Sequence, residues 1–230
     1  MNNALDHTRI YLVRHGQVAP RWQGRIYGDM DVELSPQGEA QARAAARRLR
    51  DIELSAVVSS GLERAVFGAE AIAAGRLLTP EIDSGLREMN RGAWRGLTFR
   101  ELETQSPGAW AEWFAEPRDR RAPDGETLGE LAQRVLAALD RLAARHAGKS
   151  VAVVSHSWPI RVSSATALGL ELEASVGLEL STGEISVVDW PMAGIANPGG
   201  GVAPRLSGFS MDAPPIRSGW FQRPKDSLNR

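Results

Sequence analysis

Short apolar runs recur along the first 190 positions of the chain, separated by polar and helix-forming stretches. Residues 10–13, 56–58 and 151–154 are continuous runs of mostly aliphatic and β-branched side chains, a pattern typical of strands covered on both faces. A weaker strand is predicted around 77–82. Another is predicted over 184–189, where the alternation of side chains suggests an antiparallel strand at an edge of the sheet.

Helix signals lie between these strands. Ser35 and Pro36 suit the cap and first turn of a helix that continues to Arg50. Thr127 and Glu130 form a capping-box pattern, after which apolar residues recur at helical spacing. Further helices are predicted over about 62–74 and 159–168. Strands that alternate with helices predict an α/β fold of three layers, a mainly parallel sheet flanked by helices.

One domain is predicted over residues 1–190, with a small helical insertion at about 97–122. Within the insertion, Thr98 and Glu101 form a second capping-box pattern, and Ser106-Pro107 marks a further helix start.

A change of composition begins at Pro191, where Gly and Pro become frequent. Residues 191–230 are therefore predicted to be a tail with little regular structure. Trp220 and Phe221 lie in this tail and can pin it to the domain or to a second copy, which allows a homodimer.

Composition and charge exclude several classes of function. The formal net charge is -1, so there is no global electrostatic attraction for nucleic acid or an anionic membrane. The chain has no cysteine, which excludes disulfides, thiolate catalysis and cysteine-based zinc sites. Its first residues are polar, and no apolar run is long enough to span a bilayer. We therefore expect a soluble, cytoplasmic protein without nucleic-acid or membrane partners.

Unusual polar residues follow three of the predicted strands: Arg14-His15-Gly16, Ser59-Ser60-Gly61 with Arg64 nearby, and Ser155-His156-Ser157. Ligands of open α/β sheets bind beyond the carboxyl ends of the strands, so these side chains are expected to meet at one edge.

The chemistry of this group suits a phosphate ester. Arg14 and Arg64 offer permanently charged forks that match phosphate oxygens, and imidazole is a competent nucleophile. His15 is therefore a candidate to attack phosphorus, and His156, if protonated, can stabilise the phosphoryl oxygens. The two other histidines, His7 and His146, are expected to be structural or solvated.

Six segments in order resemble the histidine phosphatase superfamily in its phosphoglycerate mutase-like branch. They are LVRHG (12–16), GDMDVELSPQG (28–38), SSGLERA (59–65), LREMNRGAWRG (86–96), PDGET (123–127) and VVSHS (153–157). The resemblance covers roughly residues 9 to 190. It implies the fold of that branch, metal-independent phosphoester chemistry and no cofactor.

The resemblance also implies roles for single residues. His15 would become phosphohistidine, and Glu88 would be the general acid and then the base for water. Arg14, Arg64 and His156 would hold the transferred phosphoryl group. The expected substrate-binding residues are Gln17, Arg21, Gly28, Ser157 and Trp158.

The chain departs from the family pattern at several positions. Val18 stands where the family usually has Ser or Thr, Arg21 where it often has Asn, and Gly61 where Pro is common. Ser157-Trp158 replaces a common Gly-Gly, so Trp158 can narrow the pocket or stack on a substrate. These departures leave the substrate open.

The prediction is thus a hydrolase of small phosphorylated metabolites. It is favoured over a mutase because the glycolytic mutases of the family that the chain resembles usually carry a longer insertion than this chain does. Three alternatives stay open: an aspartyl phosphatase built on Asp29-Met30-Asp31, a zinc hydrolase using His15 and His156, and a non-catalytic phosphate-binding protein. The substrate-reading groups are expected in the irregular middle of the chain, around Trp94, Trp110, Trp113 and Arg118 to Arg121.

Overall fold

The computed structural model describes residues 7–191 and 204–208, and these form one six-stranded sheet in the order β3-β2-β4-β1-β5-β6. Strands β1 to β4 are parallel, β5 is antiparallel to β1, and β6 is antiparallel to β5. The strands are β1 (His7–Arg14), β2 (Ala56–Ser59), β3 (Glu81–Ile82), β4 (Ser150–Ser155), β5 (Ile185–Pro191) and β6 (Arg205–Gly208). The predicted α/β fold with a mainly parallel sheet is confirmed.

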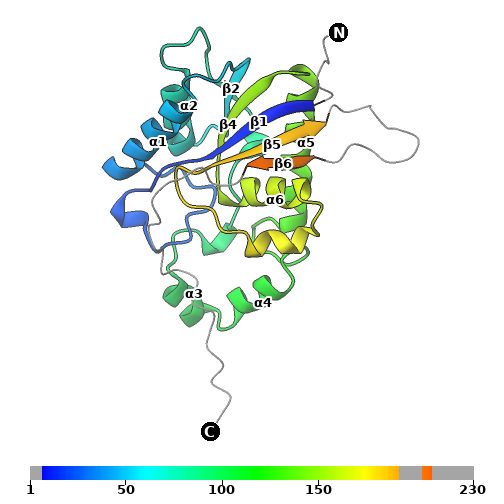
Figure 1. Cartoon of the computed structure of the whole chain (residues 1–230). Helices are drawn as coiled ribbons and strands as arrows, with labels where there is room; N and C mark the ends of the chain where they lie inside the picture. Colours follow the sequence, from blue (N-terminus) through cyan, green and yellow to red (C-terminus); the bar gives the residue numbers. More distant parts are fainter. Residues whose placement is uncertain (1–6, 192–203, 209–230) are drawn as a thin grey trace, which may run out of the picture.

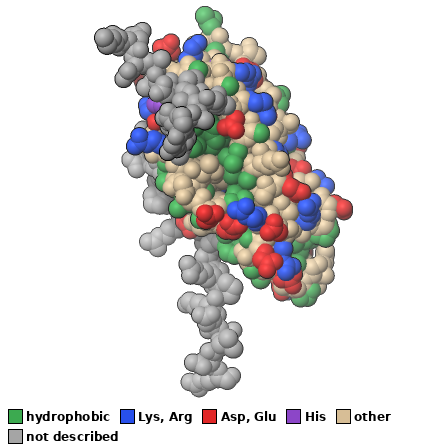
Figure 2. Space-filling view, turned by 90° about the vertical axis from the view of Figure 1, so that its right-hand side faces the viewer, with side chains coloured by type: hydrophobic (Ala, Val, Ile, Leu, Met, Phe, Trp, Pro, Cys, Tyr) green, Lys and Arg blue, Asp and Glu red, His purple; other side chains and the backbone are tan. Residues whose placement is uncertain are grey.

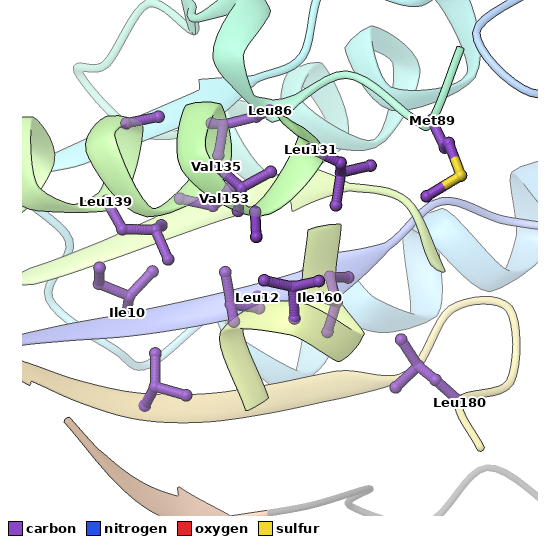
Figure 3. Close-up of a cluster of buried hydrophobic side chains, with 14 of the residues drawn as sticks. Ile10, Leu12, Leu86, Met89, Leu131, Val135, Leu139, Val153, Ile160 and Leu180 are labelled. Carbon is purple, nitrogen blue, oxygen red and sulfur yellow. The ribbon is translucent and has the colours of Figure 1, made fainter. Parts of the chain in front are cut away.

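Helices cover both faces of this sheet (Figure 1). They are α1 (Pro36–Arg48) and α2 (Glu63–Ala73) on one face, and α5 (Leu128–Arg145) and α6 (Ser157–Ala167) on the other. Because side chains alternate along a strand, Ile10 and Leu12 of β1 pack with α5 and α6, whereas Val13 packs with α1 and α2. Figure 3 shows part of the core on the α5 side.

The capping box predicted for α5 is present. Thr127 Oγ1 accepts from the Glu130 amide at 3.1 Å, and the Glu130 carboxylate accepts from the Thr127 amide at 2.9 Å. Apolar side chains recur along the buried face of this helix: Leu131, Val135, Leu139 and Leu142 are all fully buried. The helix therefore forms one wall of the core, as its spacing predicts.

The insertion consists of two short helices at the bottom of Figure 1, α3 (Phe99–Gln105) and α4 (Ala109–Ala115). The capping box of Thr98 and Glu101 begins α3, as predicted. The second helix begins later than Ser106-Pro107, because Gly108 is its cap with φ of 79°, a left-handed conformation that glycine adopts readily. Four 3-10 helices complete the described chain: Pro20–Trp22, Ser84–Leu86, Gly92–Trp94 and Leu172–Gly177.

Two expectations about the end of the chain need correction. Residues 205–208, inside the predicted irregular tail, form β6, and β5 is therefore not an edge strand. Asp189 of β5 accepts from the hydroxyl of Ser207 on β6, in addition to Arg9 on β1 at 2.7 Å. A four-residue strand in a Gly- and Pro-rich region is too short to reveal a period. Trp220 and Phe221 lie outside the described residues.

Acidic and basic side chains intermingle over the face of the molecule shown in Figure 2. This mixed surface agrees with the near-zero net charge. Among the helices that the structure describes, none is both long and apolar enough to cross a membrane.

Candidate active site

The two candidate histidines leave the sheet side by side. Arg14 at the end of β1 lies opposite Ser155 at the end of β4, so the residues that follow them emerge together. The His15 amide donates to the Ser155 carbonyl at 3.0 Å, and the ring centroids of His15 and His156 are 5.0 Å apart. The expectation that these strand ends bring the two histidines together is confirmed.

Gly16 fixes the loop that follows His15. A Cβ at Gly16 would lie 2.0 Å from the carbonyl oxygen of Gly38, and a Cβ at Gly38 would lie 2.0 Å from the carbonyl oxygen of Gln17. Only glycine allows this approach of two backbones. Ser35 caps α1 by accepting from the Gly38 amide at 3.0 Å, so the nucleophile loop is pressed against the start of that helix.

His15 is arranged as a neutral imidazole with one free lone pair. Its Nδ1 lies 2.7 Å from the carbonyl oxygen of Gly16, which assigns the proton to Nδ1 and leaves the lone pair on Nε2. Burial holds the pKa of His15 well below its usual range, and the charges of Arg64 and Arg14 lower it further. At neutral pH Nε2 can therefore act as a nucleophile.

Arg14 and Arg64 flank this ring, and their partners fix them in place. Arg64 is fully buried, and its two Nη groups donate to the carbonyls of Met30 at 2.6 Å and Gly28 at 2.8 Å. Arg14 donates through Nη1 to the carbonyl of Leu180. Burial lowers the pKa of Arg64, yet a guanidinium stays charged at physiological pH.

Three buried donors in this group have no hydrogen-bond partner among the residues described: Nε of Arg14, Nε of Arg64 and Nδ1 of His156. Buried polar groups are nearly always paired, and unpaired ones cost free energy. An anion with several oxygens, such as a phosphoryl group, satisfies three such donors at once. We call these three residues the phosphoryl cradle.

His156 is a neutral donor in the absence of an anion. Burial holds the pKa of His156 well below its usual range, and Arg64, His15 and Arg14 lower it further. Its Nε2 lies 2.7 Å from the hydroxyl oxygen of Ser60, which also accepts from the Leu62 amide at 3.3 Å. This pairing lets the Ser60 hydroxyl donate to Nε2, so that Nδ1 carries the proton offered to a ligand.

Glu88 lies at the same edge of the sheet, on the loop after the 3-10 helix Ser84–Leu86. Its Oε1 accepts from the amides of Met89 at 2.8 Å and Trp158 at 3.3 Å, and no described residue donates to Oε2. The Ser155 hydroxyl donates to the Leu86 carbonyl at 2.7 Å, which ties this loop to the end of β4. One carboxylate oxygen is thus held by the backbone and the other is available.

Arg134 of α5 also holds the loop that carries Glu88. It donates to the carbonyls of Gly85, Arg87 and Glu88 at 2.7–3.1 Å, and it pairs with the Glu126 carboxylate at 2.5 Å. Sequence reasoning missed Arg134 because it lies on the polar side of an amphipathic helix, where a charge is ordinary.

The predicted substrate-binding residues are not all brought together. Gly28 contacts Arg64, and Trp158 packs beside Arg91 and Arg161. Ser157 follows His156 directly as the first residue of α6.

Gln17 and Arg21 are held by other neighbours. Gln17 is engaged by Gln41 and Ser35, its amide donating to Gln41 at 2.8 Å and its side-chain oxygen accepting from Ser35 at 3.0 Å. Arg21 is turned to the surface, where its side chain is 70% exposed and pairs with Glu33 at 2.7 Å.

The arginine run in the middle of the chain is also engaged elsewhere. Arg118 pairs with Glu173 at 2.5 Å, Arg120 with Glu112 and Glu116, and Arg121 with Glu130. By contrast, Arg91 and Arg161 are buried near Glu88 and were missed. Arg91 lies inside the segment 86–96 that carried the family resemblance. Its positive charge, three residues after the expected general acid Glu88, was the signal in the sequence that could have identified it.

The alternative sites receive less support from the geometry. Asp29 lies 3.5 Å from Arg95, and Asp31 accepts from the Glu63 amide, in a turn that does not directly follow a strand. Among the described residues, no group of three or more His, Cys, Asp or Glu side chains is arranged to hold a metal ion. His7 lies 3.5 Å from Asp189, and His146 lies 3.0 Å from the Ser55 hydroxyl.

Comparison with known proteins agrees with this geometry. The chain is 37% identical over 163 residues to phosphoglycerate mutase-like protein 4 of Arabidopsis thaliana, covering 68% of this chain and 70% of the relative. It is 36% identical over 180 residues to a metal-independent phosphoserine phosphatase of the same plant, covering 74% and 75%.

A solved structure is similar along most of the chain. The mycobacterial glucosyl-3-phosphoglycerate phosphatase in complex with VO3 matches with a TM-score of 0.73 at 27% identity, covering 89% of this chain and 99% of that one. The family model of the histidine phosphatase superfamily (branch 1) matches residues 10–196. The chain belongs to the histidine phosphatase superfamily, branch 1.

Proposed function

We propose that this protein hydrolyses phosphomonoesters of small metabolites through a phosphohistidine intermediate on His15. The observation that carries the proposal is the neutral His15 ring, with its Nε2 lone pair unengaged, beside three unpaired buried donors. Phosphoryl transfer depends mostly on positioning and on neutralising charge, and this arrangement supplies both.

The reaction has two steps. In the first, His15 Nε2 bonds to phosphorus while the bond to the ester oxygen breaks, and the Glu88 carboxyl gives its proton to that oxygen. In the second, a water molecule gives a proton to the Glu88 carboxylate and attacks phosphorus, so that phosphate leaves and His15 returns to its neutral state. The same group serves as acid and then as base.

The phosphoryl cradle stabilises the group in transit. Two guanidinium groups and an imidazole donate to the three phosphoryl oxygens, in a site where burial strengthens each interaction. Because Arg14 and Arg64 are fixed by backbone carbonyls, they need little reorganisation when the substrate arrives.

The relatives favour hydrolysis of phosphorylated metabolites. Both a metal-independent phosphoserine phosphatase and a glucosyl-3-phosphoglycerate phosphatase resemble this chain over most of its length. We also propose that the protein works in the cytoplasm without a cofactor, for which the lack of cysteine and the presence of its own nucleophile are the support.

The test is phosphate release from an aryl phosphate such as p-nitrophenyl phosphate, with and without EDTA. The parent protein is expected to hydrolyse the ester at the same rate in both, and His15→Ala to fall below about one thousandth of that rate. Loss of activity in EDTA, or full activity in His15→Ala, contradicts the proposal.

A mutase is the second candidate, because a phosphoglycerate mutase-like protein is among the relatives. It would form the same intermediate and pass the phosphoryl group to another hydroxyl instead of water. Incubation with 3-phosphoglycerate separates the two activities, since hydrolysis yields inorganic phosphate and transfer yields the 2-phospho isomer.

A further inference from the structure

Arg91 is a buried cation that the two steps above do not use. Arg91 is only 4% exposed, and burial lowers the pKa of its guanidinium to about 10. In the part of the chain that the structure describes, its guanidinium has no hydrogen-bond acceptor and no salt-bridge partner. A buried charge is costly without an anion, so this site calls for one.

Three tryptophans surround the Arg91 guanidinium, and we call them the tryptophan cage. The Cζ atom of Arg91 lies 4.1 Å from the ring centroid of Trp113, 5.3 Å from that of Trp110 and 5.4 Å from that of Trp158. Aromatic faces attract a cation, but they offer no conventional hydrogen-bond acceptor. The N–H groups of Arg91 therefore stay available to an oxygen ligand while the rings fix the orientation of the side chain.

Arg91 reaches this cage from the edge of the phosphoryl cradle. Its Cγ lies 2.9 Å from the point where a Cβ of Gly28 would stand, and the Gly28 carbonyl accepts from Arg64 at 2.8 Å. Its two acidic neighbours are Glu88, the acid of the reaction, and Glu126. The charge of Glu126 favours the charged form of Arg91, but the Glu126 carboxylate is held at two points by Arg134 and accepts no hydrogen bond from Arg91.

Arg161 of α6 extends the positive charge between the two sites. It is buried, its Cζ lies 5.0 Å from the Trp158 ring centroid, and burial followed by the charge of Arg14 lowers its pKa to about 10. The acidic groups that act on Arg161 are Glu88 and the exposed Glu179. Arg14, Arg161 and Arg91 thus form a positive strip that runs from the phosphoryl cradle to the tryptophan cage.

A phosphate dianion in the cradle leaves the far end of this strip unneutralised. The guanidinium fork matches a planar carboxylate with two parallel hydrogen bonds. We propose that Arg91, with Arg161 beside it, binds a carboxylate of the substrate, so that the preferred substrates are phosphorylated carboxylic acids. This inference rests on the proposed function, because it assumes that the phosphoryl group occupies the cradle.

The test compares two ligands that differ only in the carboxylate. In 3-phosphoglycerate a carboxylate stands where glycerol 3-phosphate has a CH2OH group. Calorimetric titration of the His15→Ala protein, which cannot turn either ligand over, is expected to show about tenfold or more tighter binding of the acid. Adding Arg91→Met should reduce this preference to about threefold or less, while inorganic phosphate binds the two proteins alike.

Arg95→Met is the matched control, because Arg95 is an exposed arginine of the same segment whose neighbour is Asp29. It should keep the preference for the acid. If Arg91→Met weakens both ligands and phosphate equally, Arg91 only anchors the insertion and the proposal is wrong. If Arg91→Met does not fold, Arg91→Lys takes its place and should partly lower the preference for the acid. Equal binding of the two ligands by the His15→Ala protein overturns the proposal without any Arg91 variant.

The outcome for the proposed function is read separately. If the parent protein releases phosphate through His15 but shows no preference for the acid, the carboxylate inference fails alone. If the His15→Ala protein prefers the acid but the parent releases no phosphate from any ester, hydrolysis fails and the binding inference stands. If neither ligand nor inorganic phosphate binds, both fail.

Discussion

Mild acid should destabilise this protein through its two buried active-site histidines. The pKa of His15 and that of His156 lie well below the usual value, because burial and the neighbouring arginines oppose the charged form. In the unfolded chain both pKa values return to about 6.5. As the pH falls below 6.5, the unfolded state therefore binds protons that the folded state refuses, and the stability that is present above pH 6.5 is lost.

The magnitude follows from linkage. An unfolded histidine is about half protonated at pH 6.5, and the cost approaches its limit of about 1.4 kcal/mol per pH unit only further below this pKa. Between pH 6.5 and 5.5 each histidine that is protonated only when unfolded therefore costs about 1 kcal/mol, and the pair costs about 2 kcal/mol. The carboxylates with lowered pKa values, such as Glu130 and Asp189, add their own losses mainly below about pH 5, because unfolded carboxyl groups have pKa values of about 4. The interval from pH 6.5 to 5.5 thus reports on histidine.

The assay is urea unfolding at pH 7.5, 6.5 and 5.5, at constant ionic strength and without phosphate, which would bind the cradle. His15→Asn or His156→Asn should each remove about half of the acid slope, whatever its effect on stability at pH 7.5. The double variant should keep at most the slope of His146, whose pKa is lowered by partial burial and Arg145. An unchanged slope in both single variants would refute the reasoning.

Two further substitutions test the scaffold of the site. Gly16→Ala places a Cβ 2.0 Å from the Gly38 carbonyl oxygen, so it should lower the unfolding free energy by about 3 kcal/mol and abolish aryl phosphate hydrolysis. The control is Gly177→Ala, whose Cβ meets no atom within 4 Å, and it should be nearly neutral in both assays. Arg134→Met leaves the partly buried Glu126 carboxylate unpaired and frees the loop that carries the general acid. It should cost about 2–3 kcal/mol in urea unfolding and lower kcat about tenfold with little change in KM, and an unchanged kcat would show that the loop does not depend on this arginine.

Much of the fold was predictable because its strands are covered on both faces. Residues 10–13 and 151–154 read as buried strands, and parallel strands end at one edge, which is enough to bring His15 and His156 together. The helix from Thr127 was predictable because its cap and its apolar spacing are both local in sequence.

The parts that sequence reasoning missed depend on contacts between distant segments. The tryptophan cage joins α4, α6 and the loop of Arg91, and no local pattern states that these meet. Strand β6 forms by pairing with the edge of β5, and a four-residue segment is too short for its sequence to predict this pairing. Arg21 was expected near the phosphoryl group, yet the structure pairs it with Glu33 across its own loop, so its substrate-binding role stays a prediction.

The most direct test of the central claim is to trap the phosphoryl group on His15. In Glu88→Gln, p-nitrophenyl phosphate should still phosphorylate the histidine, because nitrophenolate leaves without help from an acid, but water has no base for the second step. We predict a burst of about one nitrophenolate per protein, with phosphate found by mass spectrometry on the His15 peptide. Absence of the burst together with phosphate on another residue, such as Asp29 or Asp31, would contradict the account.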